Sequence, residues 1–267
     1  MTHRQSKFKQ TQKNLIVLIT SILSLPGALA AELGSQVKTV SQPLRILIVV
    51  TSHGTFDGTS EQTGYWLSEV AHFQQTVKAK GYQVDYVSPQ GGNPPMDEKS
   101  RDLKDPLNQA FLRDAEGMSK LEHSLRPSEV TASSYAAIYY AGGHGPLWDL
   151  PVDAGIQKLA QDIDQKSGVV SAVCHGPAGL LNLKRADGTS LIQGKRVTGL
   201  TNLEETLSGK SGKVPYRLQD ELKKRGARFD AGFPFFSHVV VDGRLVTGQN
   251  PNSTIAVAEA VLQVLGK

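Results

Sequence analysis

The chain has 267 residues, of which 39% are hydrophobic and 20% are charged. This composition excludes a disordered, collagen-like or disulfide-stapled chain and predicts one large core or two small ones. Four of the 29 basic residues lie in residues 1–30, which hold no acidic residue, so the remainder carries 25 basic against 25 acidic residues. Because the body of the chain is neutral and aromatic residues make up only 6% of the whole chain, we predict no nucleic-acid partner.

Residues 1–30 have the form of a secretory signal peptide. A basic segment precedes an apolar run over residues 15–25, and Ala28 and Ala30 supply the small residues that a signal peptidase reads. The run is shorter than the roughly 20 residues of a membrane-spanning helix; an uncleaved membrane anchor is the alternative. We expect cleavage after Ala30 or Ala31, a linker over residues 31–42, and a mature chain that is periplasmic or secreted, with no membrane partner after processing.

Apolar segments after the linker alternate between strand-like and helix-like periodicity. The predicted strands are residues 45–51, 82–88, 135–141, 169–173 and 196–200, with a hairpin at 239–247. The predicted helices are residues 65–80, 152–166, a short one from Pro177, 216–225, and a last one from its cap Asn252 to Leu265. The polar residues 89–134 predict an inserted cap. The pattern predicts an α/β fold, with a doubly wound, mostly parallel sheet that has helices on both faces and binds ligands at the carboxyl ends of its strands.

Cys174 is the only cysteine, so no intramolecular disulfide is possible. It lies between a predicted buried strand and a predicted helix, with the small residues Ala172 and Gly176 two positions away on either side. This spacing resembles a nucleophile elbow, in which a tight turn presents one side chain at the carboxyl edge of a sheet. Because a helix N-terminus favours a thiolate, we expect an exposed thiol with a lowered pKa. The alternative is a small, buried, inert side chain.

Two further features are predicted to lie near this turn. His175 follows the cysteine directly, where its imidazole can act as acid and base if the ring turns back over the sulfur. The segment Gly142-Gly143-His144-Gly145 follows a predicted strand, and the backbone N–H groups of Gly143 and His144 are candidates for an oxyanion hole. The alternatives are a histidine without a catalytic role and a plain glycine-rich turn.

Five ordered motifs carry a resemblance to a known family. They are Trp-Leu-Ser-Glu at 66–69, Ala-Gly-Gly-His-Gly at 141–145, Ala-Val-Cys-His-Gly-Pro-Ala at 172–178, Gly-Leu-Thr-Asn-Leu-Glu-Glu at 199–205 and Asp-Gly-Arg-Leu-Val-Thr-Gly-Gln-Asn-Pro at 242–251. Together they resemble the PfpI-type branch of the class I glutamine amidotransferase-like superfamily, within it the group of heat-shock chaperones and glutathione-independent glyoxalases (glyoxalase III). The resemblance implies a flavodoxin-like domain over residues 43–267 with a cap insertion at about 89–134, and a homodimer.

The resemblance also implies site roles for residues that match the family's motifs. Cys174 is the nucleophile and His175 the adjacent histidine, Glu205 is the acid that orients this histidine, and Glu69 is the carboxyl that contacts the sulfur. Glu204 is a rival for the role of Glu205, and spacing alone does not choose between them. The chain departs from the family in two respects: members of this group are usually cytosolic, whereas this chain has the form of an exported one, and residues 89–134 contain no motif that carries the resemblance.

The implied function is a lyase of the D-lactate dehydratase type, which converts methylglyoxal or glyoxal to a 2-hydroxy acid without a cofactor. One alternative is a stress holdase chaperone that binds unfolded clients, with residues 233–236 as a candidate apolar patch. Another is a cysteine peptidase or amidase that uses Cys174, His175 and Glu205. We predict no metal, because His53, His72, His144 and His175 show none of the usual metal-ligand spacings.

Overall fold

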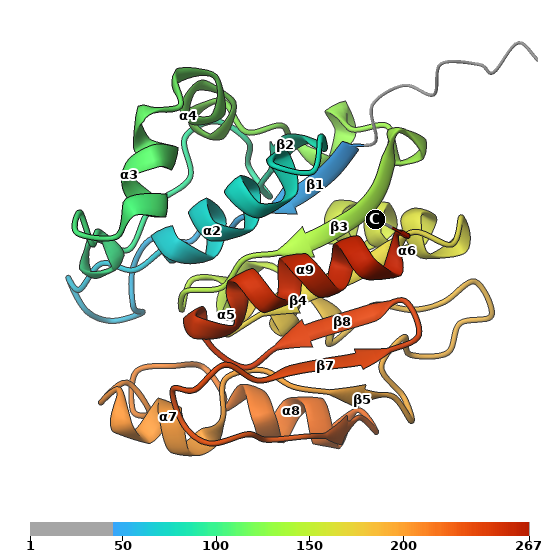
Figure 1. Cartoon of the computed structure of the whole chain (residues 1–267). Helices are drawn as coiled ribbons and strands as arrows, with labels where there is room; N and C mark the ends of the chain where they lie inside the picture. The colour runs from blue at the N-terminus through green and yellow to red at the C-terminus, as the bar shows by residue number, and fades with distance from the viewer. Residues whose placement is uncertain (1–44, 267) are drawn as a thin grey trace, which may run out of the picture. The chain divides into compact units, whose positions relative to one another are not determined.

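A six-stranded sheet forms the centre of the fold (Figure 1). Its strands lie in the order β2-β1-β3-β4-β8-β7, and all neighbours are parallel except the antiparallel pair β7 and β8. The strands are β1 (Arg45–Val49), β2 (Gln83–Val87), β3 (Tyr135–Tyr140), β4 (Val169–Val173), β7 (Val239–Asp242) and β8 (Leu245–Gly248). The predicted mostly parallel sheet is therefore confirmed. This computed structural model describes residues 45–266; the predicted leader and linker lie outside them.

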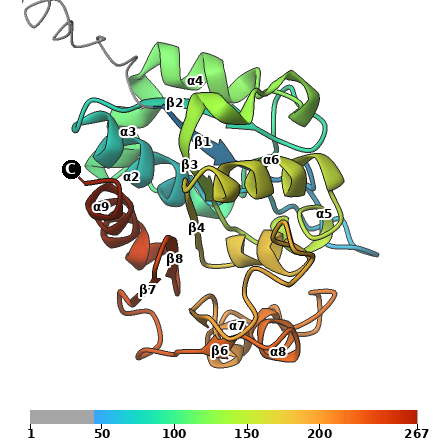
Figure 2. The ribbon, with the colours of Figure 1, turned by 90° about the vertical axis from the view of Figure 1, so that its right-hand side faces the viewer.

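Helices cover both faces of the sheet, as expected for strands such as β1 and β4 that are buried along almost their whole length. Ile46 and Ile48 of β1 point into one core with helices α2 (Leu67–Lys78) and α9 (Thr254–Val264). Leu47 and Val49 point into the other core with α6 (Ala154–Gln165) and the 3₁₀ turn η4 (Gly176–Leu180). Figure 2 shows the sheet between α2 and α9 on one side and α6 on the other. The predicted doubly wound arrangement is confirmed.

The segment between β2 and β3 adds no strand to the sheet. It contains the short turns η1 (Glu98–Ser100), η2 (Pro127–Glu129) and η3 (Ala132–Ser134), and the helices α3 (Pro106–Arg113) and α4 (Ala115–Glu122). Asp105 caps α3 by accepting from the amides of Leu107 and Asn108, and α3 packs against α2 while α4 packs against β2. Within residues 45–266 no helix is long and apolar enough to cross a membrane.

Two predictions about the C-terminal part are wrong. The strand predicted over residues 196–200 is only β5 (Arg196–Val197), which pairs with β6 (Arg228–Phe229) in a separate two-stranded sheet near α7 (Asn202–Leu207) and α8 (Leu218–Lys224). It does not pair with β4, because β8 occupies that side of β4 in the main sheet and β7 forms the edge beyond it. Asn252 does not cap the last helix: its N-cap is Ser253, and Asn250 begins a short 3₁₀ turn before it, η5 (Pro251–Ser253).

Candidate active site

Cys174 occupies a sharp turn at the carboxyl end of β4. Its φ of +58° lies in the left-handed region, which costs a residue with a Cβ about 1 kcal/mol. The turn is held from both sides, because the Cys174 amide donates to the Gly248 carbonyl and the Leu200 amide donates to the Cys174 carbonyl. A Cβ on Gly176 would lie 2.2 Å from the Tyr140 carbonyl oxygen, so a larger residue does not fit there. This strained geometry is what the predicted nucleophile elbow requires.

The thiol itself differs from the prediction. Cys174 is only 5% exposed. Burial raises its pKa well above the ordinary range and the Glu69 carboxyl raises it further, while the N–H groups of Gly143 and His175 hydrogen-bond to the sulfur and oppose this. The expected exposed thiol with a lowered pKa is wrong, because the following turn is a five-residue 3₁₀ segment with little dipole and burial outweighs it. The sulfur is nevertheless reachable, since Cys174 lines a cavity.

Glu69 is a fully buried carboxyl in the first turn of α2, beside the Cys174 thiol. Its Oε2 accepts from the Gly142 amide at 2.6 Å, and its Oε1 has no hydrogen-bond partner that meets the usual geometry among the described residues. Burial raises the pKa of Glu69 to about 8, against the opposing hydrogen bonds from Gly142 and Cys174. Glu69 is therefore largely protonated at neutral pH and holds a transferable proton next to the sulfur.

The turn after β3, which contains Gly142 and Gly143, brings the backbone close to the Glu69 carboxyl and the Cys174 sulfur. A Cβ on Gly142 would lie 2.7 Å from Glu69 Oε2, and one on Gly143 would lie 2.1 Å from the Gly64 carbonyl oxygen. Gly143 also has a φ of +91°, which side chains rarely adopt. Because both positions exclude a side chain, the Gly143 N–H can reach the sulfur, where an oxyanion formed by attack of the thiolate would also lie.

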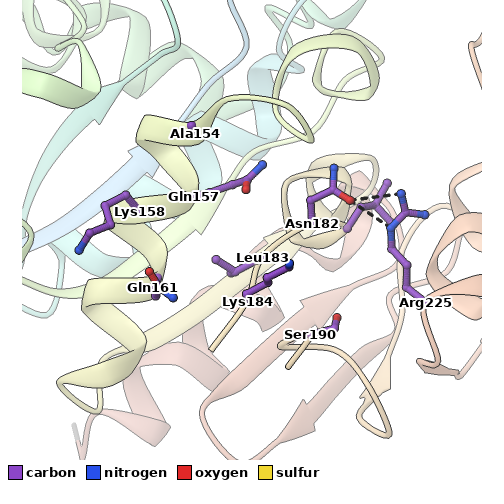
Figure 3. A pocket seen from close by; sticks show the side chains of 10 residues that line it. Ala154, Gln157, Lys158, Gln161, Asn182, Leu183, Lys184, Ser190 and Arg225 are labelled. Carbon is purple, nitrogen blue, oxygen red and sulfur yellow. Dashed lines mark hydrogen bonds between the residues drawn. The ribbon is translucent and has the colours of Figure 1, made fainter. Parts of the chain in front are cut away.

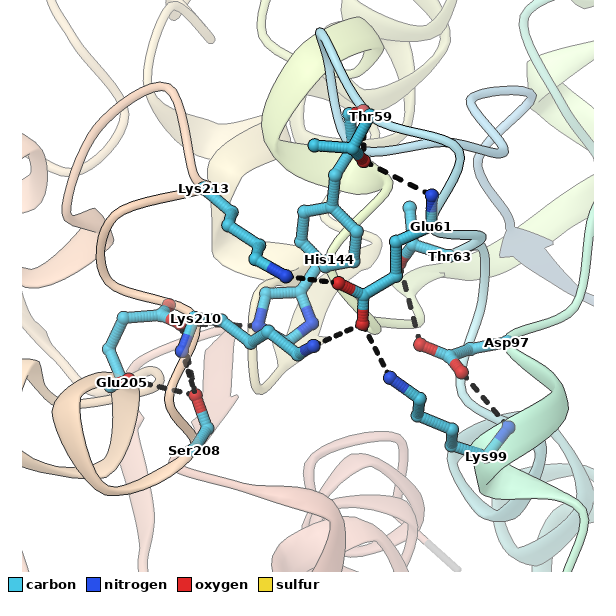
Figure 4. Close-up of polar contacts among 11 residues, drawn as sticks. Thr59, Glu61, Thr63, Asp97, Lys99, His144, Glu205, Ser208, Lys210 and Lys213 are labelled. Atoms are coloured by element: carbon cyan, nitrogen blue, oxygen red, sulfur yellow. Dashed lines mark hydrogen bonds and ion pairs between the residues drawn. The ribbon is translucent and has the colours of Figure 1, made fainter.

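Glu205 binds two imidazoles with its two oxygens. Oε2 lies 2.7 Å from His175 Nε2. Oε1 lies 3.1 Å from His144 Nε2, a contact that Figure 4 shows. Burial acts to raise the pKa of Glu205, but hydrogen bonds from His144 and His175 hold it well below its ordinary range. Glu205 is thus an acceptor only, so each Nε2 carries the proton that it donates. In a neutral His175 ring that donates from Nε2, Nδ1 is the nitrogen that can accept a proton, and it faces Cys174 Sγ at 3.6 Å.

The pairing of the His144 imidazole with Glu205 was not predicted: the sequence suggested a catalytic role only for the His144 amide. The His144 ring centroid lies 4.4 Å from that of His175, and His144 lines the same cavity as Cys174. Burial lowers the pKa of His144 and the neighbouring His175 lowers it further, against the effect of Glu205. A histidine between glycines directly after a buried strand was the available signal, because that position lies at the carboxyl edge of the sheet.

Glu204, the rival of Glu205, points away from His175. Its Oε2 accepts from the amide and hydroxyl of Thr201 at the N-cap of α7, and its Oε1 accepts from the Phe235 amide and from Asn250 Nδ2. The four donor–acceptor distances are 2.8–3.0 Å. Burial acts to raise the pKa of Glu204, but these hydrogen bonds lower it overall. The geometry therefore favours Glu205 as the partner of His175.

Glu204→Gln is expected to lower the free energy of unfolding by about 2 kcal/mol, because an amide nitrogen cannot accept these hydrogen bonds. Glu205→Gln is the matched control, one residue further on, and we expect it to lower kcat by about 10²-fold through its effect on His175. Urea unfolding and steady-state kinetics on both variants measure the difference. A catalytic defect in Glu204→Gln with unchanged stability would reverse the two assignments.

Cys174, His175, Gly143 and His144 line a cavity of about 660 Å³. The donor atoms of His144, His175 and Glu205 lie within 4.8 Å of one another, which also makes them a possible metal-ligand set. Of the other two histidines considered, His53 stacks on Trp148 outside this lining, whereas His72 lines the same cavity and pairs with Asp105. A second cavity, of about 740 Å³, lies beside α6 and Arg225 and holds none of the predicted site residues (Figure 3).

Comparisons with known proteins agree with this architecture. The model of the DJ-1/PfpI family matches residues 61–264. The chain is 35% identical over 237 residues to a glutathione-independent glyoxalase of Saccharomyces cerevisiae, covering 84% of this chain and 98% of the relative. It is 31% identical to glyoxalase 3 of Candida albicans, covering 82% and 97%.

Two solved structures are similar over most of their length. The crystal structure of glyoxalase III from Candida albicans matches with a TM-score of 0.76 at 30% identity, covering 83% of this chain and 97% of that one. The Rapid Encystment Protein 24 kDa of Francisella tularensis matches with a TM-score of 0.81 at 38% identity, covering 84% and 100%. The predicted resemblance is confirmed: the chain belongs to the DJ-1/PfpI family.

Proposed function

We propose that this protein is a glutathione-independent glyoxalase that converts methylglyoxal or glyoxal to a 2-hydroxy acid. One observation carries the proposal: the Cys174 sulfur contacts the buried Glu69 carboxyl, lies 3.6 Å from His175 Nδ1 and borders a cavity. This supplies a nucleophile, a base for its proton and a second acid in one place. The names of the relatives in Saccharomyces cerevisiae and Candida albicans support the same activity.

The first step is addition of the sulfur to the aldehyde. His175 Nδ1 removes the thiol proton, the sulfur bonds to C1, and the C1 oxygen takes up a proton from Glu69, giving a hemithioacetal. The Gly143 N–H stabilises the negative charge that develops on this oxygen, and the His144 N–H is the second candidate donor. Glu205 holds the His175 ring and stabilises its imidazolium.

The second step moves hydrogen within the substrate. Glu69, now a carboxylate, removes the C1 proton while the imidazolium of His175 protonates the C2 oxygen, which gives an enediol. Glu69 then protonates C2 and His175 removes the C1 hydroxyl proton, which leaves a thioester. Water cleaves the thioester to the 2-hydroxy acid and restores the thiol, and the proton held by His175 returns to Glu69. C1 is oxidised, C2 is reduced and one water is consumed, so no external oxidant or cofactor is needed.

The test is to incubate the purified protein with methylglyoxal in the absence of glutathione and to measure lactate with a stereospecific assay. We expect lactate to form in a one-to-one ratio with the methylglyoxal consumed, with and without EDTA. Consumption of methylglyoxal without lactate would show only adduct formation and would contradict the proposal. A peptidase or amidase using Cys174, His175 and Glu205 is less well supported, because a protonated Glu69 suits proton transfer on a carbonyl better than acyl transfer alone.

A holdase role is a second candidate, favoured by three exposed phenylalanines. Phe233, Phe235 and Phe236 are 74%, 47% and 66% exposed, which a buried core segment would not be. Asn250 and Asn252 hold the carbonyls of Phe236 and Phe235 in this loop. The test measures how well the protein suppresses the aggregation of a denatured client. We expect Cys174→Ala to retain this suppression and Phe233→Ser/Phe236→Ser to lose it. Suppression retained in both variants would exclude this patch.

We further propose that the chain is exported and forms a homodimer. The signal-peptide form of residues 1–30 supports export, and the family resemblance supports the dimer. Intact mass of the protein recovered from the producing cells tests cleavage after Ala30 or Ala31. Light scattering of that protein measures the mass of the assembly.

A further inference from the structure

Three lysine ammonium groups surround the single carboxylate of Glu61 (Figure 4). Glu61 lies in the loop between β1 and α2, Lys99 lies in η1, and Lys210 and Lys213 lie in the loop after α7. Lys99 Nζ is 2.5 Å from Glu61 Oε1, Lys210 contacts the same oxygen, and Lys213 contacts Oε2. Three positive charges meet one negative charge, so the cluster carries an excess of two positive charges.

Two of these lysines belong to the cavity that contains Cys174. Lys99 and Lys210 line it, whereas Lys213 does not. The Lys210 ammonium lies over the Phe56 ring at 5.3 Å, and that ring lies 5.3 Å from the His144 ring. The Lys210 amide also donates to Ser208 Oγ, which in turn donates to Glu205 Oε1, both at 3.3 Å. Lys210 is thus connected to the site that holds Cys174.

The acidic groups of the cavity do not form ion pairs with these ammonium groups. Asp97 accepts from the backbone amide of Lys99 and Asp102 from that of Lys104, while Asp105 pairs with His72 and Glu204 with its four donors. Glu61 is the carboxylate that contacts both Lys99 Nζ and Lys210 Nζ among the described ion pairs. Each ammonium has three donors, so both retain donors for a further anion.

The volume of the cavity indicates a substrate larger than methylglyoxal. A volume of about 660 Å³ lies in the range that holds drug-sized ligands, whereas methylglyoxal has only five non-hydrogen atoms. On the basis of the function proposed above, we infer that the preferred substrates are 2-oxoaldehydes that carry a terminal carboxylate. Lys99 and Lys210 bind the carboxylate while the aldehyde carbon reaches the Cys174 sulfur. The chemistry is unchanged: C1 is oxidised to a carboxylate, C2 is reduced to an alcohol and one water is consumed.

The test compares 4,5-dioxopentanoate with 2-oxopentanal, a neutral 2-oxoaldehyde with the same five-carbon chain. We expect the full chain to turn over the acid with a kcat/KM about tenfold higher, which is the size of one charge-assisted interaction. The Lys99→Met/Lys210→Met variant is expected to lose this preference. Raising NaCl from about 0.05 to 0.5 M is expected to lower kcat/KM for the acid more than for the neutral compound.

Lys213→Met is the matched control, because it removes one positive charge from beside Glu61 at a residue that does not line the cavity. This variant should retain most of the preference for the acid. Lys210→Arg should also retain it, and this variant covers the case in which the double variant does not fold. Equal kcat/KM for the two compounds in the wild type, or an unchanged ratio in the double variant, overturns the inference alone. Absence of turnover for both compounds overturns the proposed function, and with it this inference.

Discussion

Cys174→Ala is expected to abolish the conversion of methylglyoxal to lactate, with a fall in kcat of at least about 10⁴-fold. Every proposed intermediate is bonded to this sulfur, and no other thiol exists in the chain to replace it. Cys174→Ser is the matched control, because it keeps a side chain of similar size at the strained φ of +58°. Its hydroxyl is a far weaker nucleophile, so kcat is expected to fall by a comparable factor.

Stability measurements separate this loss from misfolding. Since both variants keep a Cβ at the turn, the backbone strain is unchanged, and we expect the free energy of unfolding to stay within about 1.5 kcal/mol of the wild type. Thermal unfolding followed by circular dichroism measures this alongside lactate formation. Turnover by Cys174→Ala within about 10²-fold of the wild type would show that the sulfur is not the nucleophile.

The fold was largely predictable because burial on both faces leaves a clear pattern. The mostly apolar, β-branched residues of β1 and β4 define central parallel strands, and the Asp242-Gly243 pair marks the β7–β8 hairpin. Residues 196–200 carry the same kind of pattern, but whether a strand joins a sheet depends on which edge is still unpaired. The pairing of a strand depends on the topology of the whole sheet, which a short stretch of sequence does not reveal.

The sequence predicted which residues form the site better than it predicted their burial and pKa values. Small neighbours located the turn at Cys174, but its burial depends on β3, β8 and α2, which are distant in sequence. The choice between Glu204 and Glu205 also required the structure, because one residue along a helix turns a side chain by about 100°. The role of the His144 imidazole was not predicted because its partner, Glu205, is 61 residues away.

Glu69→Gln is expected to stabilise the protein at neutral pH while lowering kcat by about 10³-fold. The catalytic loss follows because an amide cannot move the proton between C1 and C2. The gain in stability follows from the raised pKa of about 8 in the folded chain against 4.5 as the ordinary value. When the pKa of a carboxyl is higher in the folded chain than in the unfolded chain, the carboxyl ionises at lower pH in the unfolded chain. The free energy of unfolding therefore falls as the pH rises between the two pKa values.

The pH dependence gives the sign and the size of this effect. The wild type loses stability relative to Glu69→Gln as pH rises from the ordinary pKa of 4.5 towards the folded pKa of about 8. At pH 7 the difference amounts to about 3 kcal/mol, and near pH 4 it falls below about 0.5 kcal/mol. The substituted amide keeps an oxygen for the Gly142 N–H and places its nitrogen where Oε1 lacks a partner. Urea unfolding of both proteins between pH 4 and 8 measures the difference; a pH-independent difference would mean that Glu69 is ionised in the folded protein and is not the acid that supplies the first proton.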